Sequence, residues 1–421
     1  MQLTSTPVAF TGIAASLIDC GQTIHSRFGV PIPIERDSVS RINVRSPEAQ
    51  IIRNSSLIIW DEASMCPAYV AECVDRLLRD VTGLRDVIFG GKCVVFGGDF
   101  RQTLPVVPSS DPAETVKHSL KASYLWPTVT KLSLTRNQRA LPEEREFAEY
   151  LLRIGNGQEQ IIHEDLVRIP DRCLLHQNES EIDFVFGNGE ITRAQLSESN
   201  CAILTPTNVE AIELNELALE RMPYQMHTYR SVDTVKVDEG EQDIFPVEVA
   251  NSITPNGYPL HQLNLKEGAV IMLIKNLSIK DGLCNGTRLI VTRCGENTIQ
   301  ARILFGTHRN KQFTFPRVSF NTMDPTAEIQ MTRVQFPFRL AFAMTINKSQ
   351  GQTFDRICIS LRNPVFAHGQ LYTSMSRVRA FDHVKVKVFD INSGSCIQGK
   401  VNGPNNGVYT RNVVCREILY D

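Results

Sequence analysis

Polar side chains that could act on a nucleoside triphosphate follow two apolar runs, at the point where each run ends. Residues 57–60 lead into Asp61 and Glu62, and residues 94–98 lead into Asp99 and, three positions on, Gln102. In an α/β sheet the ligand crevice lies outside the carboxyl ends of the strands, so we expect these side chains to face one site. One carboxylate can hold Mg²⁺ through its water shell, a second can orient an attacking water, and a glutamine can contact a γ-phosphate. The two runs together predict a nucleoside-triphosphate motor, although an Asp-Glu pair by itself is more often a helix cap or a solvated turn.

The glycine-rich phosphate loop of such motors is absent from the printed sequence. No G-x-x-x-x-G-K-[ST] occurs. The two Gly-Lys dipeptides, Gly91-Lys92 and Gly399-Lys400, are followed by Cys93 and Val401. The cradle of backbone N–H groups and lysine that this sequence supplies is therefore missing from the chain as given.

Further polar loops are candidates for contact with phosphates. Asn137-Gln138-Arg139 offers an arginine finger or merely a surface charge, and Arg377 and Arg379 follow a predicted helix over residues 369–376. The loop of residues 347–353 gathers six hydrogen-bonding side chains around one glycine, which suits a phosphodiester backbone and a nucleotide but also a solvated turn. Residues 23–26 grip phosphates or cap a helix, and His25 has no second ligand at metal-binding spacing.

Composition bounds the class of protein. The 421 residues are 42% apolar and 21% charged, with a net charge of −2, so two or three globular domains are expected and no overall basic signature exists. Residues 333–400 hold ten Lys/Arg against three Asp/Glu, whereas residues 141–200 hold five against thirteen; this reflects either a phosphate-attracting portion or chance differences between solvated faces. Eleven scattered cysteines without a C-x-x-C motif indicate reduced thiols. The sequence contains no run of about 18 apolar residues, so we expect no membrane span.

The order of predicted elements indicates an α/β fold with an insertion. A strand at residues 8–10 opens the chain, residues 31–54 read as a surface insertion without sustained period, and residues 69–79 have helical spacing. Residues 201–204 restart the strand-then-helix pattern, residues 268–336 change to short alternating strands, and residues 339–344 resume the α/β pattern as a strand. The predicted domains are 1–140 (first lobe), 141–199 (acidic connecting segment), 200–267 (start of the second lobe), 268–336 (inserted small β-barrel), 337–392 (remainder of the second lobe) and 393–421 (C-terminal tail).

The ordered set of motifs resembles the Pif-type helicases of superfamily one, in particular the branch that includes the helicase part of Helitron transposons. The resemblance spans nearly the whole chain and includes two RecA-like lobes of the P-loop NTPase fold. It rests on residues 11–15, 23–26, 60–65, 98–102, 137–139, 265–289, 339–353 and 371–377.

The resemblance implies a DNA-stimulated ATPase that moves 5′ to 3′ along single strands and opens duplexes, in DNA repair, recombination and telomere maintenance, in the nucleus or mitochondrion. ATP and Mg²⁺ are the implied cofactors, and single-stranded DNA and duplex junctions the implied partners, with no membrane. By resemblance, Asp61 holds Mg²⁺, Glu62 activates water, Gln102 senses the γ-phosphate, and Arg139 and Arg377 are fingers. Further expected positions at the nucleotide are Asp99, Gly351 and Gln352. The expected DNA track consists of Thr11, Gly12, Thr23, His25, Ser26, Lys348, Ser349 and Gln350.

The family's phosphate loop lies upstream of the Thr11 motif, so we expect this chain to be an N-terminally truncated form that hydrolyses ATP poorly. Two alternatives stay open: a DNA helicase, and an ATPase-deficient or transposon-derived remnant that acts at most as a DNA-binding module. A structural protein with no nucleic-acid role is disfavoured because the acidic, amide and arginine motifs occur together. The oligomeric state is left open.

Overall fold

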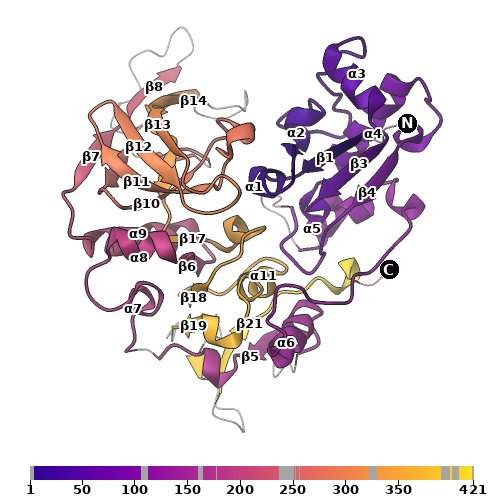
Figure 1. The fold of residues 1–421 in the computed structure, drawn as a ribbon. Helices are drawn as coiled ribbons and strands as arrows, with labels where there is room; N and C mark the ends of the chain where they lie inside the picture. Colours follow the sequence, from indigo (N-terminus) through magenta and orange to yellow (C-terminus); the bar gives the residue numbers. More distant parts are fainter. Residues whose placement is uncertain are drawn as a thin grey trace. The chain divides into compact units, whose positions relative to one another are not determined.

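The computed structural model describes residues 4–105, 112–159, 165–176, 178–236, 251, 253–255, 257–321, 330–389, 399–400 and 407–419. The chain divides into two compact units (Figure 1). Unit 1 consists of Met1–Asn188, Asn200–Leu214 and Ala343–Asp421, and unit 2 of Gly189–Ser199 and Asn215–Phe342. Each unit has its own sheets, and the mixed α/β class predicted from the sequence is confirmed.

The first sheet of unit 1 is parallel and has the order β2-β1-β3-β4. Its strands are β1 (Ser5–Ala9), β2 (Gln22–Thr23), β3 (Leu57–Asp61) and β4 (Cys93–Phe96). Ala9 lies opposite Asp61, and Trp60 lies opposite Phe96. The residues that follow β1, β3 and β4 therefore emerge at one edge, as the sequence predicted.

Helices pack on this sheet through their apolar faces. The helix α4 (Ala68–Thr82) confirms the predicted helical spacing, and it buries Val70, Val74 and Leu78 in a core that includes Trp60. Shorter helices are α1 (Gly12–Ser16), α2 (Ile24–Arg27) and α5 (Pro112–His118). The prediction of residues 31–54 as an aperiodic insertion was wrong at its end, where α3 (Pro47–Asn54) forms. Ser46 caps α3 and Pro47 occupies its first turn, a start signal that outweighs the weak apolar period.

The second sheet of unit 1 is also parallel, with the order β17-β6-β18-β19. Its strands are β6 (Cys201–Thr205), β17 (Ala343–Thr345), β18 (Arg356–Leu361) and β19 (Val384–Val388), and α9 (Asn208–Glu220) follows β6. All five residues of β6 and the last five of β18 are buried, as expected where both faces of a parallel sheet are covered.

The single strand predicted over residues 339–344 was wrong. The run divides into β16 (Phe338–Leu340), which pairs antiparallel with β10 in unit 2, and β17, which pairs parallel with β6 in unit 1. Ala341 and Phe342, both fully buried, separate the two strands. A run of apolar residues predicts that the segment is buried. It does not indicate that the chain passes from one sheet to another inside that segment.

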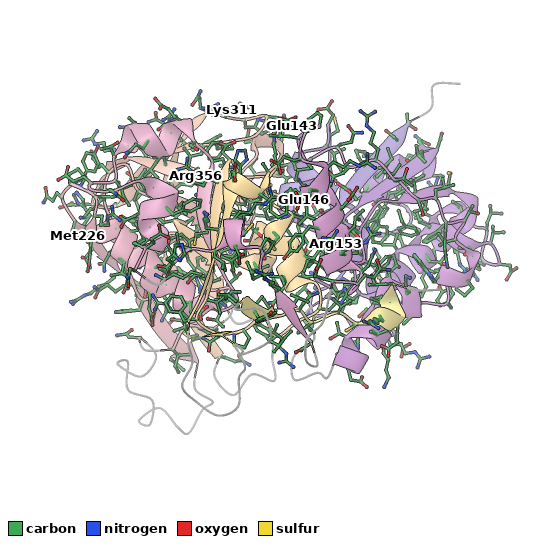
Figure 2. All side chains as sticks on the ribbon, turned by 90° about the horizontal axis from the view of Figure 1, so that it is seen from below. Glu143, Glu146, Arg153, Met226, Lys311 and Arg356 are labelled. Atoms are coloured by element: carbon green, nitrogen blue, oxygen red, sulfur yellow. The ribbon has the colours of Figure 1, made fainter. Side chains whose placement is uncertain are left out.

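The acidic segment predicted as a connector contains regular structure in unit 1. The helix α6 (Arg145–Gly155) buries Phe147, Tyr150 and Ile154 and directs Glu146 and Arg153 outward (Figure 2). The helix α7 (Glu181–Phe186) follows, and β5 (Leu166–Arg168) pairs with β21 (Val408–Arg411), which in turn pairs with β20 (Gly399–Lys400). The segment α11 (Gln370–Met375) confirms the helix predicted at residues 369–376.

Unit 2 is mainly antiparallel. Its largest sheet has the order β13-β12-β11-β10-β16, and two smaller sheets have the orders β14-β15-β8 and β7-β9. The bounds are α8 (Arg193–Glu198), β7 (His227–Arg230), β8 (Val232–Lys236), β9 (Gln262–Leu265), β10 (Val270–Leu273), β11 (Arg288–Cys294), β12 (Thr298–Ile303), β13 (Gln312–Pro316), β14 (Val318–Asn321) and β15 (Gln330–Gln335). The short alternating strands were predicted correctly, and closure into one small barrel stays a prediction. The domain boundaries also stay predictions.

No helix in the described part of the chain has the length and apolar character that a bilayer crossing requires.

Gly369, just before α11, holds the chain in a left-handed conformation that residues with a side chain rarely adopt. Its φ is +71°, and a Cβ there would lie 2.3 Å from the carbonyl oxygen of Arg101 and 2.7 Å from the carbonyl carbon of Gln102. Gly83, which ends α4 at φ +77°, has nothing within 4 Å of the same position. The two glycines therefore share a backbone conformation but differ in close approach.

We expect Gly83→Ala to destabilise the protein by about 1 kcal/mol, because alanine is strained at a positive φ. Gly369→Ala should cost at least about 2 kcal/mol more, because its Cβ would also clash with the backbone of residues 101–102. Urea denaturation of the two variants measures the difference. Equal losses of unfolding free energy would show that the approach at residues 101–102 is not tight.

Candidate active site

Glu62 stands directly at the end of β3 in a strained backbone conformation. Its φ and ψ are +51° and +38°, a left-handed conformation that is uncommon for a residue with a side chain. Its N–H donates to Asp61 Oδ1 at 2.9 Å, and the N–H of Ala63, the first residue of η1 (Ala63–Met65), donates to the carbonyl oxygen of Gly97 at 2.8 Å. The bond from Ala63 to Gly97 ties the tips of β3 and β4 together, so the two acidic motifs share one edge as predicted.

The loop after β4 turns Asp99 and Gln102 in different directions. Tyr372 Oη donates to Asp99 Oδ2 at 2.7 Å, and the N–H of Arg101 donates to Asp99 Oδ1 at 3.1 Å. Gln102 Oε1 is buried and has no hydrogen-bond partner. A buried amide oxygen costs free energy when it stays unpaired, so this atom is poised to accept a donor that binds there.

Two arginines of unit 1 act on the charge of Glu62: Arg377 follows α11, between β18 and β19 of the second sheet, and Arg139 lies in the loop before α6. Arg377, 1% exposed, donates to the carbonyl oxygens of Thr373 at 2.8 Å and Gln352 at 3.4 Å, and to Ser376 Oγ at 2.7 Å. Arg139, half-buried, donates to Thr353 Oγ1 at 3.2 Å and to the carbonyl oxygen of Ser376 at 3.0 Å.

Neither of these arginines forms an ion pair with a carboxylate of the described residues. Hydrogen bonds to neutral partners leave the positive charge of these guanidiniums only partly compensated, by the nearby charges of Glu62 and Asp99. The site therefore favours an anion.

The electrostatics of the site follow from burial and from this charge arrangement. Burial raises the pKa of Glu62, and Asp61 raises it further, while Arg377, the amide of Gln350 and Arg139 lower it. Burial lowers the pKa of Arg377, and the like charge of Arg139 lowers it further. Arg377 and Arg139 thus lie near enough to Glu62 to affect its pKa, and the convergence of these groups on one nucleotide stays a prediction.

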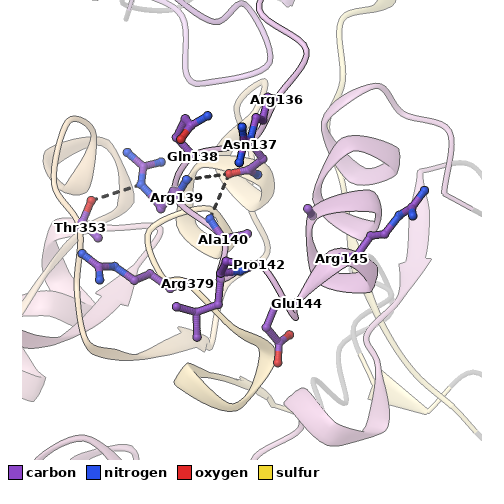
Figure 3. Close-up of a pocket in the computed structure, with 12 residues that line it drawn as sticks. Arg136, Asn137, Gln138, Arg139, Ala140, Pro142, Glu144, Arg145, Thr353 and Arg379 are labelled. Atoms are coloured by element: carbon purple, nitrogen blue, oxygen red, sulfur yellow. Dashed lines mark hydrogen bonds between the residues drawn. The ribbon is translucent and has the colours of Figure 1, made fainter.

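A pocket of about 750 Å³ adjoins Arg139 (Figure 3). Asn137 Oδ1 accepts the N–H groups of Arg139 and Ala140, which fixes the turn that presents Arg139. The charged residues of its lining are Arg136, Arg139, Glu144, Arg145 and Arg379. Four guanidiniums against one carboxylate make the pocket cationic, which suits a phosphate-bearing ligand.

Several residues predicted to contact DNA are helix caps in the structure. Thr11 Oγ1 accepts the N–H of Ala14 at 3.2 Å, and Thr23 Oγ1 accepts the N–H of Ser26 at 3.4 Å. The capping alternative therefore describes both hydroxyls, whose DNA contacts stay predictions. Gly12 is buried, Ser26 is exposed, and His25 packs against Phe10 with ring centroids 5.7 Å apart.

The loop after β17 has its polar residues directed to different places. Ser349 Oγ donates to the carbonyl oxygen of Ile346 within η7 (Ile346–Ser349), and Gln352 Nε2 donates to the carbonyl oxygen of Lys348. Gly351 has φ +77°, and a Cβ there would lie 3.9 Å from Glu62 Oε1. Gln350, expected on the DNA track, instead directs its amide to Glu62 and Thr103.

The comparisons with known proteins agree with this geometry. Residues 2–165 match the family model described as PIF1-like helicase, and residues 248–294 match the one described as the 2B domain of DNA helicase Pif1. Over these segments the chain is similar to the PIF1-like helicases. It is 28% identical to human "ATP-dependent DNA helicase PIF1" over 394 residues, which are 91% of this chain and 54% of that protein. The chain thus spans about half the length of this curated relative.

Solved Pif1 structures have the same fold. A structure of forked dsDNA unwinding by two coordinating Pif1 helicases matches with a TM-score of 0.66 and 26% identity, over 93% of this chain and 83% of that one. The Bacteroides Pif1 helicase in complex with ADP-AlF3 and ssDNA matches with a TM-score of 0.65 and 26% identity, over 92% and 83% of the two chains. The two RecA-like lobes predicted for this PIF1-like chain are confirmed by these matches.

Sequence reasoning missed the residues that hold the strand-tip loop of this PIF1-like chain. Thr103 donates its N–H to Thr373 Oγ1 at 3.1 Å, and Tyr372 bonds Asp99 as described above. His368, 4% exposed, contacts the carbonyl oxygen of Phe100 through Nε2 at 2.7 Å and accepts the N–H of Cys415 at Nδ1, at 2.9 Å. The sequence offered one signal for Thr103, its position directly after Gln102. Its partner Thr373 lies 270 residues away along the chain, so the contact could not be read from local sequence.

The His368 bonds fix a neutral ring. Because Nδ1 accepts a hydrogen bond, Nε2 carries the proton that is donated to Phe100. Burial lowers the pKa of His368, although the carbonyl of Phe100 and the charge of Asp99 oppose that shift. Protonation would place a donor against the Cys415 N–H.

We expect the free energy of unfolding to fall as the pH drops from 7 to 5, because unfolded His368 takes up a proton near its ordinary pKa of about 6.5 and the folded side chain resists it. His368→Gln should flatten this dependence, whereas replacement of the exposed His176 by Gln should leave it. Urea unfolding at each pH provides the measurement. An unchanged slope in His368→Gln would contradict the assignment.

Proposed function

We propose that this chain carries the motor core of an ATP-dependent 5′–3′ DNA helicase of the Pif1 type. It would couple Mg-ATP hydrolysis to movement along single-stranded DNA and to duplex unwinding. The observation that supports this most directly is the pair formed by the buried Arg377 and the half-buried Arg139. Neither forms an ion pair with a carboxylate of the described residues, and both lie close enough to Glu62 to lower its pKa. A triphosphate supplies the missing negative charge.

The chain's own residues fit the two groups that hydrolysis requires. Asp61 Oδ1 is occupied by the N–H of Glu62, which leaves Oδ2 for Mg²⁺ or its water shell. The unpaired Gln102 Oε1 and the buried, unpaired Ser64 Oγ are further polar atoms in need of partners. ATP supplies the anhydride bond and Mg²⁺ screens its charge. Among the described residues no cluster of three His, Cys, Asp or Glu could hold a metal by itself, so substrate oxygens and water would complete the coordination.

Each proposed role follows from position. Glu62, whose pKa is raised by burial, takes the proton of the attacking water, and Gln102 orients that water or a γ-phosphate oxygen. Arg139 and Arg377 neutralise the charge that develops on the transferred group. Arg377 lies in a loop of the second sheet, and Arg139 is bonded to Thr353 and Ser376 in loops of that sheet. Closure of these loops around the nucleotide would therefore couple hydrolysis to DNA movement.

Single-stranded DNA and duplex junctions are the proposed partners. The solved relatives with ssDNA and with forked dsDNA support this, as does Lys348 on the loop after β17. Thr11, Gly12, Thr23, His25 and Ser26 would line the same track. The proposed location is the nucleus, with the mitochondrion as the second DNA-containing compartment, and the proposed processes are repair, recombination and telomere maintenance.

We expect Glu62→Gln to lower DNA-stimulated ATP hydrolysis by about 100-fold or more, because a general base typically contributes 10² to 10⁴. Phosphate release by the purified protein, with and without single-stranded DNA, measures this rate. Glu213→Gln, which changes an exposed glutamate of the same unit, should keep full activity. Single-strand binding without turnover in the unsubstituted protein would contradict the motor proposal and support the DNA-binding module instead.

We expect Lys348→Ala to weaken single-stranded DNA binding and to reduce the slope of log K against log salt by about one counterion, because a lost phosphate contact releases one fewer ion. Fluorescence anisotropy over a salt series measures both. Lys117→Ala, on the exposed face of α5, is the matched control. An unchanged slope would remove Lys348 from the DNA track.

A further inference from the structure

The side chain of Gln350 joins Glu62 to the loop after β4. Gln350 is 3% exposed. Its Nε2 donates to Glu62 Oε2 at 3.3 Å, and its Oε1 accepts from the hydroxyl of Thr103. Thr103, 2% exposed, thus holds one end of the amide while the other end contacts the carboxylate.

The chemistry of the three groups fixes the direction of this relay. An ionised carboxylate accepts hydrogen bonds and donates none, so it must face the NH₂ end of the amide. The amide oxygen then faces Thr103, whose hydroxyl donates. Loss of the Thr103 hydroxyl would leave the amide free to turn its oxygen toward the Glu62 carboxylate, an arrangement that is repulsive.

Hydrogen bonds to buried groups hold both the loop that carries Gln350 and the loop that carries Thr103 in place. Asn347 Oδ1, in η7, accepts from Gln370 Nε2 at 3.3 Å, and Gln370 Oε1 accepts the N–H groups of Phe366 and Ala367. Thr103 donates its N–H to Thr373 Oγ1. The amide is therefore held at a defined place between the loop after β17 and the loop after β4.

We propose that Gln350 is a positioning residue for Glu62, and that Thr103 sets the orientation of the Gln350 amide. The inference rests on the proposed function, because it assigns Gln350 to the hydrolytic centre and away from the DNA track. Glu62 stands in a left-handed backbone conformation with its side chain partly buried, and the Gln350 amide is the one side-chain hydrogen bond that its carboxylate makes among the described residues. Without that bond the carboxylate can rotate away from the attacking water.

The consequence is a link between the two parallel sheets of unit 1. Gln350 belongs to the loop after β17, and Thr103 to the loop after β4. A shift of either loop displaces the amide and with it the carboxylate of Glu62. The proton-accepting group is thereby correctly placed only when both loops are in position.

The test is a split between kcat and KM for ATP. We expect Gln350→Ala to lower kcat about 10- to 100-fold with KM for ATP changed less than about twofold, because positioning acts on the chemical step. Thr103→Val, nearly isosteric, should lower kcat about 3- to 10-fold, and Thr103→Ser, which keeps the hydroxyl, should recover most of that loss. Gln50→Ala, which removes an exposed glutamine amide on α3, should behave as the unsubstituted protein.

Single-stranded DNA affinity separates this assignment from the DNA track. Gln350→Ala should bind DNA within about twofold of the unsubstituted protein, since its amide faces Glu62. A loss of DNA affinity, or a raised KM with kcat unchanged, would overturn the proposal while the proposed function stood.

A second measurement does not depend on turnover. In protein labelled with ¹³C at the glutamate side-chain carboxyls, the Glu62 resonance is assigned with Glu62→Gln at one fixed pH. It should move in Gln350→Ala and in Thr103→Val, and it should stay in place in Thr103→Ser and Gln50→Ala. A resonance that ignores Gln350→Ala would refute the contact even if the unsubstituted protein hydrolysed no ATP.

Discussion

An arginine taken out of water must have its charge compensated, and this constraint organises the active-site half of unit 1. Arg377 is almost fully buried, yet its partners are two carbonyl oxygens and a hydroxyl. Neutral acceptors satisfy the N–H groups and leave the charge, which raises the energy of the ligand-free protein. Binding an anion relieves that cost, so the same feature that destabilises the free site favours a phosphate in it.

Unit 2 shows the alternative solution to the same problem. Arg333 is 0% exposed and forms two hydrogen bonds with Asp233, at 2.9 and 2.7 Å, and it donates two further N–H groups to carbonyl oxygens. Here the charge is paired inside the protein, and Arg333 and Asp233 link β15 to β8. The contrast separates a structural arginine, which carries its own counterion, from Arg377, which lacks one.

Polar loops, not apolar packing, carry the connection between the two parallel sheets near Glu62. Asp99 with Tyr372, Thr103 with Thr373, and Gln350 with Glu62 each join a strand-tip loop of one sheet to a segment of the other. The strength of a hydrogen bond depends on distance and angle more steeply than that of an apolar contact does. Small loop movements can therefore break these bonds. An interface of this kind suits a site that must change between nucleotide states.

The sequence by itself determined the strands that end in Asp61-Glu62 and in Asp99, the helices α4 and α11, and the family, because apolar period and motif order are local properties that survive without the fold. It did not determine α3, the division of residues 339–344 between two sheets, or the partners of Thr103, Tyr372 and His368. The place of Gln350 on the DNA track stays a prediction, and the sequence did not show the bond of its amide to Glu62. The tertiary structure alone decided these, since the direction of a buried side chain depends on groups that lie up to about 290 residues away along the chain.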